Sequence, residues 1–254
     1  YEKCKIAHLE AGLRSGDKFS PFPEEANRKL TGAISDFHFA PTELAKNALL
    51  KENIHDNVWV VGNTVVDALL LGLENLRNRA IDFKDEFEYI DFTKPVVLIT
   101  AHRRESFGKP FEDICDAILD IKQAHPEVQF IYPVHFNPNV REVVNRKLAD
   151  IKGIFLIEPL DYPRLIWLME KSTIILTDSG GIQEEAPALG KPVLVMRDVT
   201  ERIEGIDAGT AKLVGTDKDV IVTNLHALLS NTDGMYDKMA KAVNPYGDGT
   251  TSKQ

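Results

Sequence analysis

The stretch from Ser179 to Glu185 combines residue types that suit a nucleotide diphosphate. Ser179, Gly180 and Gly181 lie between an apolar run at 173–177 and a segment with a helical pattern, and Glu185 follows one helical turn later. A strand, turn and helix in this order leave backbone N–H groups unpaired at the helix start, where the helix dipole favours a phosphate. Glu185 is then placed to accept hydrogen bonds from ribose hydroxyls. An ordinary tight turn is the alternative; the serine and the acid favour a nucleotide site, although the Rossmann glycine spacing and the P-loop motif are absent.

A second polar loop, beginning with His102, Arg103 and Arg104, follows another apolar run. A histidine beside two arginines can bind an anion and transfer protons near neutral pH. Ligands of an open α/β sheet lie off the carboxyl ends of its strands, so we expect this loop to face the same crevice as Ser179. A solvated basic loop is the alternative. His135 ends a further strand, where contact with a ligand and a structural hydrogen bond are equally favoured.

Two carboxylates lie near the start of the chain. Glu10 ends an apparent strand at 6–9, and Glu24 follows Pro23, which we expect at the first position of a helix that Gly32 ends. The two carboxylates could meet across one loop and serve acid/base chemistry if their pKa values are pushed apart. Solvated surface glutamates are the alternative, and the motif by itself does not exclude it.

Short apolar runs alternate with amphipathic segments, which predicts an α/β fold with a parallel sheet covered on both faces. The charged, strand-free stretch 74–92 indicates a connecting helix and linker, with a domain boundary near residue 70 and five strands after it. Amphipathic helices are expected at 111–125 and 138–152. The strands are expected at 6–9, 58–61, 96–100, 129–134, 154–157, 173–177 and 193–196.

Composition narrows the functional classes. The 254 residues include 30 Lys and Arg against 39 Asp and Glu, and the net charge of −9 argues against a protein that coats nucleic acid. Two cysteines without metal-like spacing, Cys4 and Cys115, suit a reducing cytoplasm. No apolar run reaches the roughly 18 residues of a membrane helix, so no membrane partner is expected. No metal motif is evident, and His38, His55, His125 and His226 show no partners in the sequence.

Nine runs, in order along almost the whole chain, resemble the non-hydrolysing UDP-N-acetylglucosamine 2-epimerases: 8–14, 20–28, 62–67, 102–108, 132–139, 178–187, 190–197, 200–202 and 244–249. The resemblance implies a glycosyltransferase-B-like fold, in which two Rossmann-like domains enclose the active site. Residues 1–69 would be the C-terminal part of the first domain, 70–243 the second, UDP-binding domain, and 244–254 the start of a segment returning to the first. Because the chain lacks an initial Met and starts inside an apparent strand, we expect a fragment without most of the first domain.

The resemblance also implies a reaction. The family interconverts UDP-GlcNAc and UDP-ManNAc without an added cofactor, by eliminating UDP and adding it back to a 2-acetamidoglucal intermediate. By motif, Glu10 and Glu24 would be acid/base groups and His102 would assist the departure of UDP. A further family aspartate would lie upstream of residue 1.

The same resemblance places the ligands. Ser179, Gly180 and Gly181 would hold the diphosphate and Glu185 the ribose. Residues that contact a second, activating UDP-GlcNAc in bacterial members would correspond to Glu25, Arg103 and His135. The expected partners are UDP-GlcNAc and UDP, and a homodimer is expected from the family only. A retaining glycosyltransferase of the same architecture, a non-catalytic sugar-nucleotide-binding protein and the hydrolysing form of the epimerase remain as alternatives.

Overall fold

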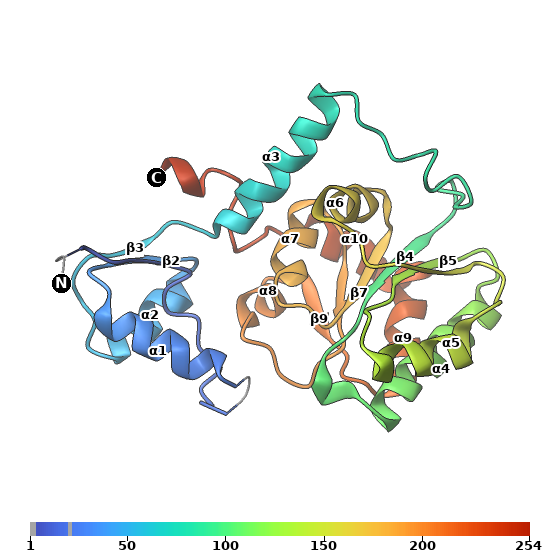
Figure 1. The fold of residues 1–254 in the computed structure, drawn as a ribbon, viewed down its shortest axis with the longest axis horizontal. Coiled ribbons are helices and arrows are strands. Elements are labelled where there is room, and N and C mark those ends of the chain that lie inside the picture. Colours follow the sequence, from blue (N-terminus) through green and yellow to red (C-terminus); the bar gives the residue numbers. More distant parts are fainter. Residues whose placement is uncertain (1–3, 20–21) are drawn as a thin grey trace.

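The computed structural model describes residues 4–19 and 22–254, and within them nine strands form two all-parallel sheets. The smaller sheet has the order β1-β2-β3 and the larger one β6-β5-β4-β7-β8-β9. Figure 1 shows the two sheets in separate parts of the molecule, the smaller one in blue. The strands are β1 (Ala7–Leu9), β2 (Phe37–Ala40), β3 (Val58–Val60), β4 (Val96–Thr100), β5 (Gln129–Pro133), β6 (Ile154–Ile157), β7 (Ile174–Thr177), β8 (Val193–Val195) and β9 (Ala211–Leu213).

The larger sheet carries the main core of the chain because helices cover both of its faces. Side chains alternate along β4, so that Val97 and Ile99 enter one buried cluster while Val96 and Leu98 enter the other. The first cluster is completed by α4 (Lys109–Ala124), α5 (Pro138–Leu148), α9 (Lys218–Leu229) and α10 (Met235–Lys241). The second is completed by α3 (Thr64–Asn78), α6 (Tyr162–Lys171) and α7 (Ile182–Ala188).

The smaller sheet packs against α1 (Glu24–Ile34) and α2 (Glu43–Lys51), with much less buried apolar surface. Its buried cluster consists of Leu13, Ala40 and Ala45. On α1, Leu30 and Ile34 remain exposed. This part of the chain therefore has little hydrophobic core within the described residues.

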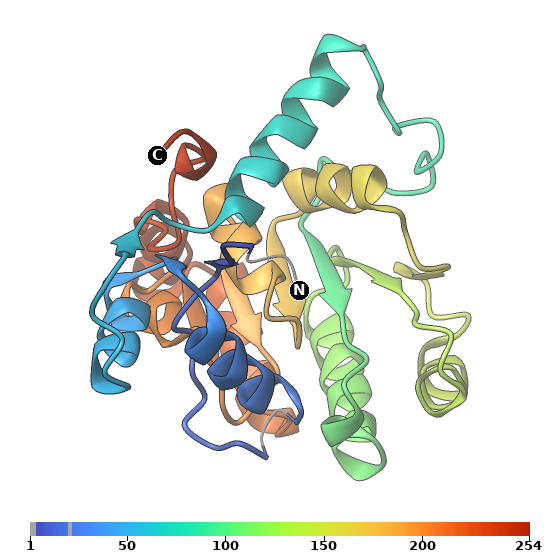
Figure 2. The same cartoon turned by 60° about the vertical axis from the view of Figure 1, so that its left-hand side comes forward.

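Helix α3 links the two parts and crosses residue 70 without interruption (Figure 1). It begins after Asn63, whose backbone N–H donates to the carbonyl of Tyr246 at 2.7 Å, and Ser252 near the end of the chain donates to Asp67 at 2.8 Å. The segment 244–254 thus returns to the start of α3, as Figure 2 also shows. The expected boundary near residue 70 falls inside this helix, and the division into domains stays a prediction.

Most predicted strands agree with the structure to within one residue, but the sequence missed β2 and β9. The larger sheet consequently has six strands after residue 70 rather than the predicted five. Both missed strands are short, and each carries a polar residue, His38 or Lys212, that breaks the apolar run. Their pairing partners, which lie far away in the sequence, make them strands.

Four helix boundaries differ from the predictions. The helix predicted over 111–125 begins two residues earlier, as α4 spans Lys109–Ala124. Gly32 does not end α1: it is buried inside the helix with no left-handed backbone angle, and α1 continues to Ile34. Pro23 caps α1, so its first helical residue is Glu24. The helix predicted over 138–152 ends at Leu148. No helix of the described residues is long and apolar enough to span a membrane.

Candidate functional site

The loops after β4 and β7 meet through Asp178, as expected for adjacent parallel strands that end at the same edge. The Asp178 side chain is buried, and its Oδ2 accepts hydrogen bonds from the backbone N–H groups of His102 at 2.6 Å and Arg103 at 2.8 Å. Its Oδ1 lies 3.6 Å from Nδ1 of His102. The predicted basic loop is therefore held next to the predicted phosphate turn.

The structure also brings His135 to this place, from the end of β5. The rings of His102 and His135 stack with their centroids 5.2 Å apart and an angle of 15° between the ring planes. Nδ1 of His135 accepts a hydrogen bond from the backbone N–H of Asn137 at 3.1 Å. His135 thus makes a structural hydrogen bond and also lies beside His102, so the two alternatives do not exclude each other.

The turn Ser179-Gly180-Gly181 separates β7 from α7, as the sequence predicted. Within the described residues, no hydrogen bond engages the backbone N–H groups of Gly180 and Gly181. A Cβ on Gly180 would lie 3.0 Å from Cζ of Arg202. A side chain at Gly180 would therefore press against the Arg202 guanidinium, which lies directly against the turn, where an anion would meet both the N–H groups and the guanidinium.

Glu185 lies on the buried side of α7, and its Oε1 accepts a hydrogen bond from the Tyr162 hydroxyl at 2.6 Å. A Cβ on Gly181 would be 3.6 Å from Oε2, so the second oxygen faces the turn. Burial raises the pKa of Glu185, although the Tyr162 hydrogen bond opposes this shift. One carboxylate oxygen is thus positioned by Tyr162, while the other lies beside the turn predicted to hold a diphosphate.

Glu10 belongs to the smaller sheet, yet it is connected to the same region. The amide of Asn63 donates to Glu10 at 3.1 Å and also to Glu184, which in turn accepts from Arg202 at 2.9 Å. Burial raises the pKa of Glu184 in spite of the Arg202 guanidinium. This chain of contacts runs from the end of β1 to the arginine beside Gly180.

Glu24 and Glu25 begin α1 and differ in exposure. Glu24 is exposed, and within the described residues no hydrogen bond or ion pair joins it to Glu10. Glu25 is fully buried, and its Oε2 accepts a hydrogen bond from the Ser15 N–H at 2.9 Å. The predicted pairing of Glu10 with Glu24 therefore stays a prediction.

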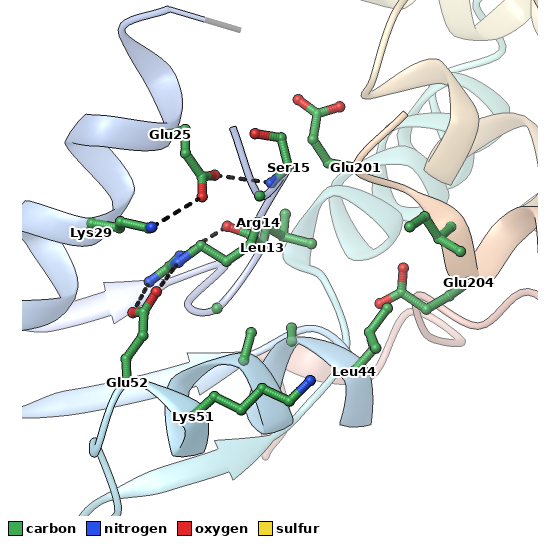
Figure 3. Close-up of a pocket in the computed structure, with 15 residues that line it drawn as sticks. Leu13, Arg14, Ser15, Glu25, Lys29, Leu44, Lys51, Glu52, Glu201 and Glu204 are labelled. Carbon is green, nitrogen blue, oxygen red and sulfur yellow. Dashed lines mark hydrogen bonds and ion pairs between the residues drawn. The ribbon is translucent and has the colours of Figure 1, made fainter. Parts of the chain in front are cut away.

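Glu25 lines a cavity of about 370 Å³ between the two parts of the chain (Figure 3). Figure 3 shows Glu25 directed toward Ser15 and Lys29, and Arg14 paired with Glu52, while Glu201 and Glu204 enter from the opposite side. Glu204 accepts a hydrogen bond from Thr42, which caps α2. The cavity thus lies where polar side chains connect the two parts.

Sequence reasoning gave no role to four residues that the structure places at this site: Asn63, Tyr162, Asp178 and Arg202. Each is far in sequence from the side chain that it contacts, but Asp178 also directly precedes the predicted turn. An aspartate at a strand end beside a serine and two glycines was the one available signal.

Two histidines predicted to lack partners contact each other outside this site. Nε2 of His125 lies 2.8 Å from Nδ1 of His226, at the ends of α4 and α9. His38 also has a ring neighbour, because it meets His8 edge-on at 6.3 Å. No group of three or more metal-ligating side chains occurs in the part of the chain that the structure describes.

Comparison with known proteins decides the family. The family model described as UDP-N-acetylglucosamine 2-epimerase matches residues 1–254. The chain belongs to this family. It is 52% identical to the UDP-N-acetylglucosamine 2-epimerase of Escherichia coli K12, an alignment that covers 98% of this chain and 67% of that protein.

Solved structures agree with this family assignment. A crystal structure of the Neisseria meningitidis UDP-GlcNAc 2-epimerase bound to UDP-GlcNAc matches with a TM-score of 0.94 and 48% identity, over 99% of this chain and 68% of that one. A co-structure of S. aureus MnaA with UDP matches with a TM-score of 0.91 and 46% identity, over 99% and 67%. The glycosyltransferase-B-like fold is thereby confirmed.

Proposed function

We propose that this chain carries the nucleotide-binding half and part of the acid/base machinery of an enzyme that interconverts UDP-GlcNAc and UDP-ManNAc. Membership in the epimerase family supports the reaction. The observation that carries the site is the Gly180 turn, where two unengaged N–H groups and the Arg202 guanidinium meet at the end of β7. This arrangement suits the diphosphate of a leaving UDP.

The chemistry follows from what the sugar must undergo. A base removes the proton from C2 while the C1–O bond to UDP breaks, which leaves a double bond between C1 and C2. Return of the proton to the opposite face, with re-addition of UDP at C1, gives the other epimer. Glu10 and Glu24 are the proposed acid/base groups, and His102 donates to the leaving phosphate oxygen.

The ligand contacts divide by region. Ser179, Gly180 and Gly181 hold the diphosphate, together with Arg202, and Glu185 accepts from the ribose through its Oε2. Arg103 and His135 flank His102 and would meet the substrate or a second, activating UDP-GlcNAc. Glu25, which lines the Figure 3 cavity, would contact the same activator. A homodimer and a cytoplasmic location are part of the proposal.

Turnover without an acceptor tests the reaction. The complete enzyme should form UDP-ManNAc from UDP-GlcNAc alone, without releasing free UDP in proportion. Glu10→Gln or Glu24→Gln should lower turnover by about 10²-fold or more while UDP affinity is retained. A requirement for a sugar acceptor would favour the glycosyltransferase. Release of free UDP in proportion to turnover would favour the hydrolysing epimerase. Binding of UDP without any turnover would favour the non-catalytic protein.

Nucleotide binding by the chain tests the phosphate turn separately. Gly180→Val should abolish UDP binding in calorimetry, because the added side chain occupies the space against Arg202. Gly32→Ala is the control, because this glycine lies inside α1 and a Cβ there would make only ordinary contacts at 3.5 Å. A folded Gly180→Val protein that bound UDP normally would contradict the proposed diphosphate site.

A further inference from the structure

We propose that Asp178 is a positioning residue that holds the imidazole of His102 in the tautomer with its proton on Nδ1. The inference rests on the proposed function. When the ring carries protons on both nitrogens, Asp178 holds the Nδ1 proton and stabilises the imidazolium, so that the Nε2 proton passes to the leaving phosphate oxygen. The neutral ring that remains keeps its proton on Nδ1, ready to be protonated again on Nε2. The inference assigns a role to a residue that the reaction itself does not touch.

The first support is the burial of the Asp178 carboxylate. Asp178 is 1% exposed, and its Oδ2 accepts hydrogen bonds from the N–H groups of His102 and Arg103. Oδ1 is buried and has no hydrogen-bond partner among the described residues. A buried carboxylate oxygen without a donor is costly, so a nearby donor is expected to satisfy it.

Nδ1 of His102 is placed to be that donor. It lies 3.6 Å from Oδ1, and the same aspartate fixes the backbone from which the His102 side chain projects. A small rotation of the ring closes this distance to a hydrogen bond, which tightens when a ligand orders the loop. The half-exposed ring, with 47% of its side chain accessible, has the freedom to make this movement.

The strand register explains why the aspartate is available. Thr100 and Thr177 are partners on neighbouring strands, and the backbone N–H of Asp178 donates to the carbonyl of Thr100 at 3.0 Å. Asp178 therefore lies beside the first residues of the His102 loop. A buried aspartate that bonds to Nδ1 orients a histidine in other acid/base sites, where its replacement by Asn yields the wrong tautomer.

Nitrogen-15 NMR of the histidine side chains tests the tautomer directly, with no need for turnover. It is recorded on the chain at about pH 8.5, well above the ordinary histidine pKa of about 6.5. Wild-type His102 should carry its proton on Nδ1. In Asp178→Asn the new amide oxygen can keep both backbone hydrogen bonds, while the amide N–H₂ donates to Nδ1 and moves the ring proton to Nε2.

His135 is an internal control in the same spectrum. Its Nδ1 accepts from the Asn137 N–H, so its proton belongs on Nε2 in both proteins. Wild-type His102 protonated on Nε2, or a His102 tautomer unchanged in a folded Asp178→Asn protein, would overturn the inference. The wild-type measurement decides even if the variant does not fold.

Kinetics of the complete enzyme separate this inference from the proposed function. Asp178→Asn should lower kcat by about 10²-fold with KM nearly unchanged. In the His102→Gln background the same change should cost nothing further, because Asp178 acts through His102. Additive losses would overturn the inference. If Asp178→Asn switched the His102 tautomer but turnover stayed normal, the inference about orientation would hold and the proposed role of His102 would be contradicted.

Discussion

Strands β2 and β7 are both four residues long and both pair in parallel on two sides, yet they bury very different amounts of side chain. All four residues of β7 are buried, whereas β2 alternates between buried and half-buried positions. Helices cover both faces of the larger sheet, and the smaller sheet shares a cluster of three buried residues. Strands with the same pairing pattern are therefore expected to contribute different amounts to the free energy of unfolding, because that contribution follows the apolar area buried.

The two parts also divide the proposed chemistry. The groups proposed to face the nucleotide lie at the well-packed larger sheet, while Glu10 and Glu24, the proposed acid/base groups, lie in the part with the smaller sheet. Polar contacts join the parts: Thr42 to Glu204, and Asn63 to both Glu10 and Glu184. The proposed nucleotide site is thus supported by a large buried core, whereas the position of Glu10 relative to it depends on a few hydrogen bonds.

The largest expected effect is on core packing. Leu176→Ala in β7 removes a side chain that is 0% exposed and should lower the free energy of unfolding by about 2–5 kcal/mol. Leu9→Ala in β1, where the leucine is 57% exposed, should change it by about 0.5 kcal/mol or less. Urea denaturation measures both. Equal losses would break the comparison between the two sheets.

A smaller effect is expected at the junction. Asn63→Ala removes the donor shared by Glu10 and Glu184 and should cost about 1–3 kcal/mol, because buried Glu184 loses a partner. Hydrogen exchange should accelerate in β1–β3 and stay slow in β4–β8. Asn224→Ala is the matched control, since among the described residues that buried amide donates to a carbonyl of its own helix. Uniform acceleration in both sheets would contradict a local junction.

The smallest expected effect is a pH-dependent gain in stability. Burial raises the pKa of Glu185, so its charged form destabilises the fold at pH 7. Glu185→Gln, which keeps an acceptor for Tyr162, should raise the free energy of unfolding by on the order of 1 kcal/mol at pH 7. The advantage should shrink as the pH falls through the raised pKa, because the wild-type carboxyl then takes up a proton.

Denaturation at pH 7 and at about pH 4.5, near the ordinary glutamate pKa, measures this difference. Glu74→Gln, at an exposed position of α3, is the matched control. A gain for Glu185→Gln that stayed constant between the two pH values would show that charge burial is not its cause.

Much of the larger sheet could be predicted from the sequence. Runs such as Val96–Thr100 and the stretch before Asp178 are apolar at every position but their last, which is a threonine, and strands covered on both faces favour this pattern. The turn at Gly180 and the loop at His102 could be placed at strand ends, and the structure confirms that placement. The smaller sheet was harder, because β2 is short and half-buried and is recognised only by its pairing with β1 and β3.

The sequence by itself determined the family, the α/β fold and the loops that carry polar groups, because residue type and local spacing record strand, turn and helix. Only the tertiary structure decided that Asp178 holds His102, that Tyr162 holds Glu185 and that Arg202 lies against Gly180. These contacts join residues up to 76 positions apart, as for Asp178 and His102. Their geometry depends on which strands are neighbours and in what register, and local sequence carries no direct record of either.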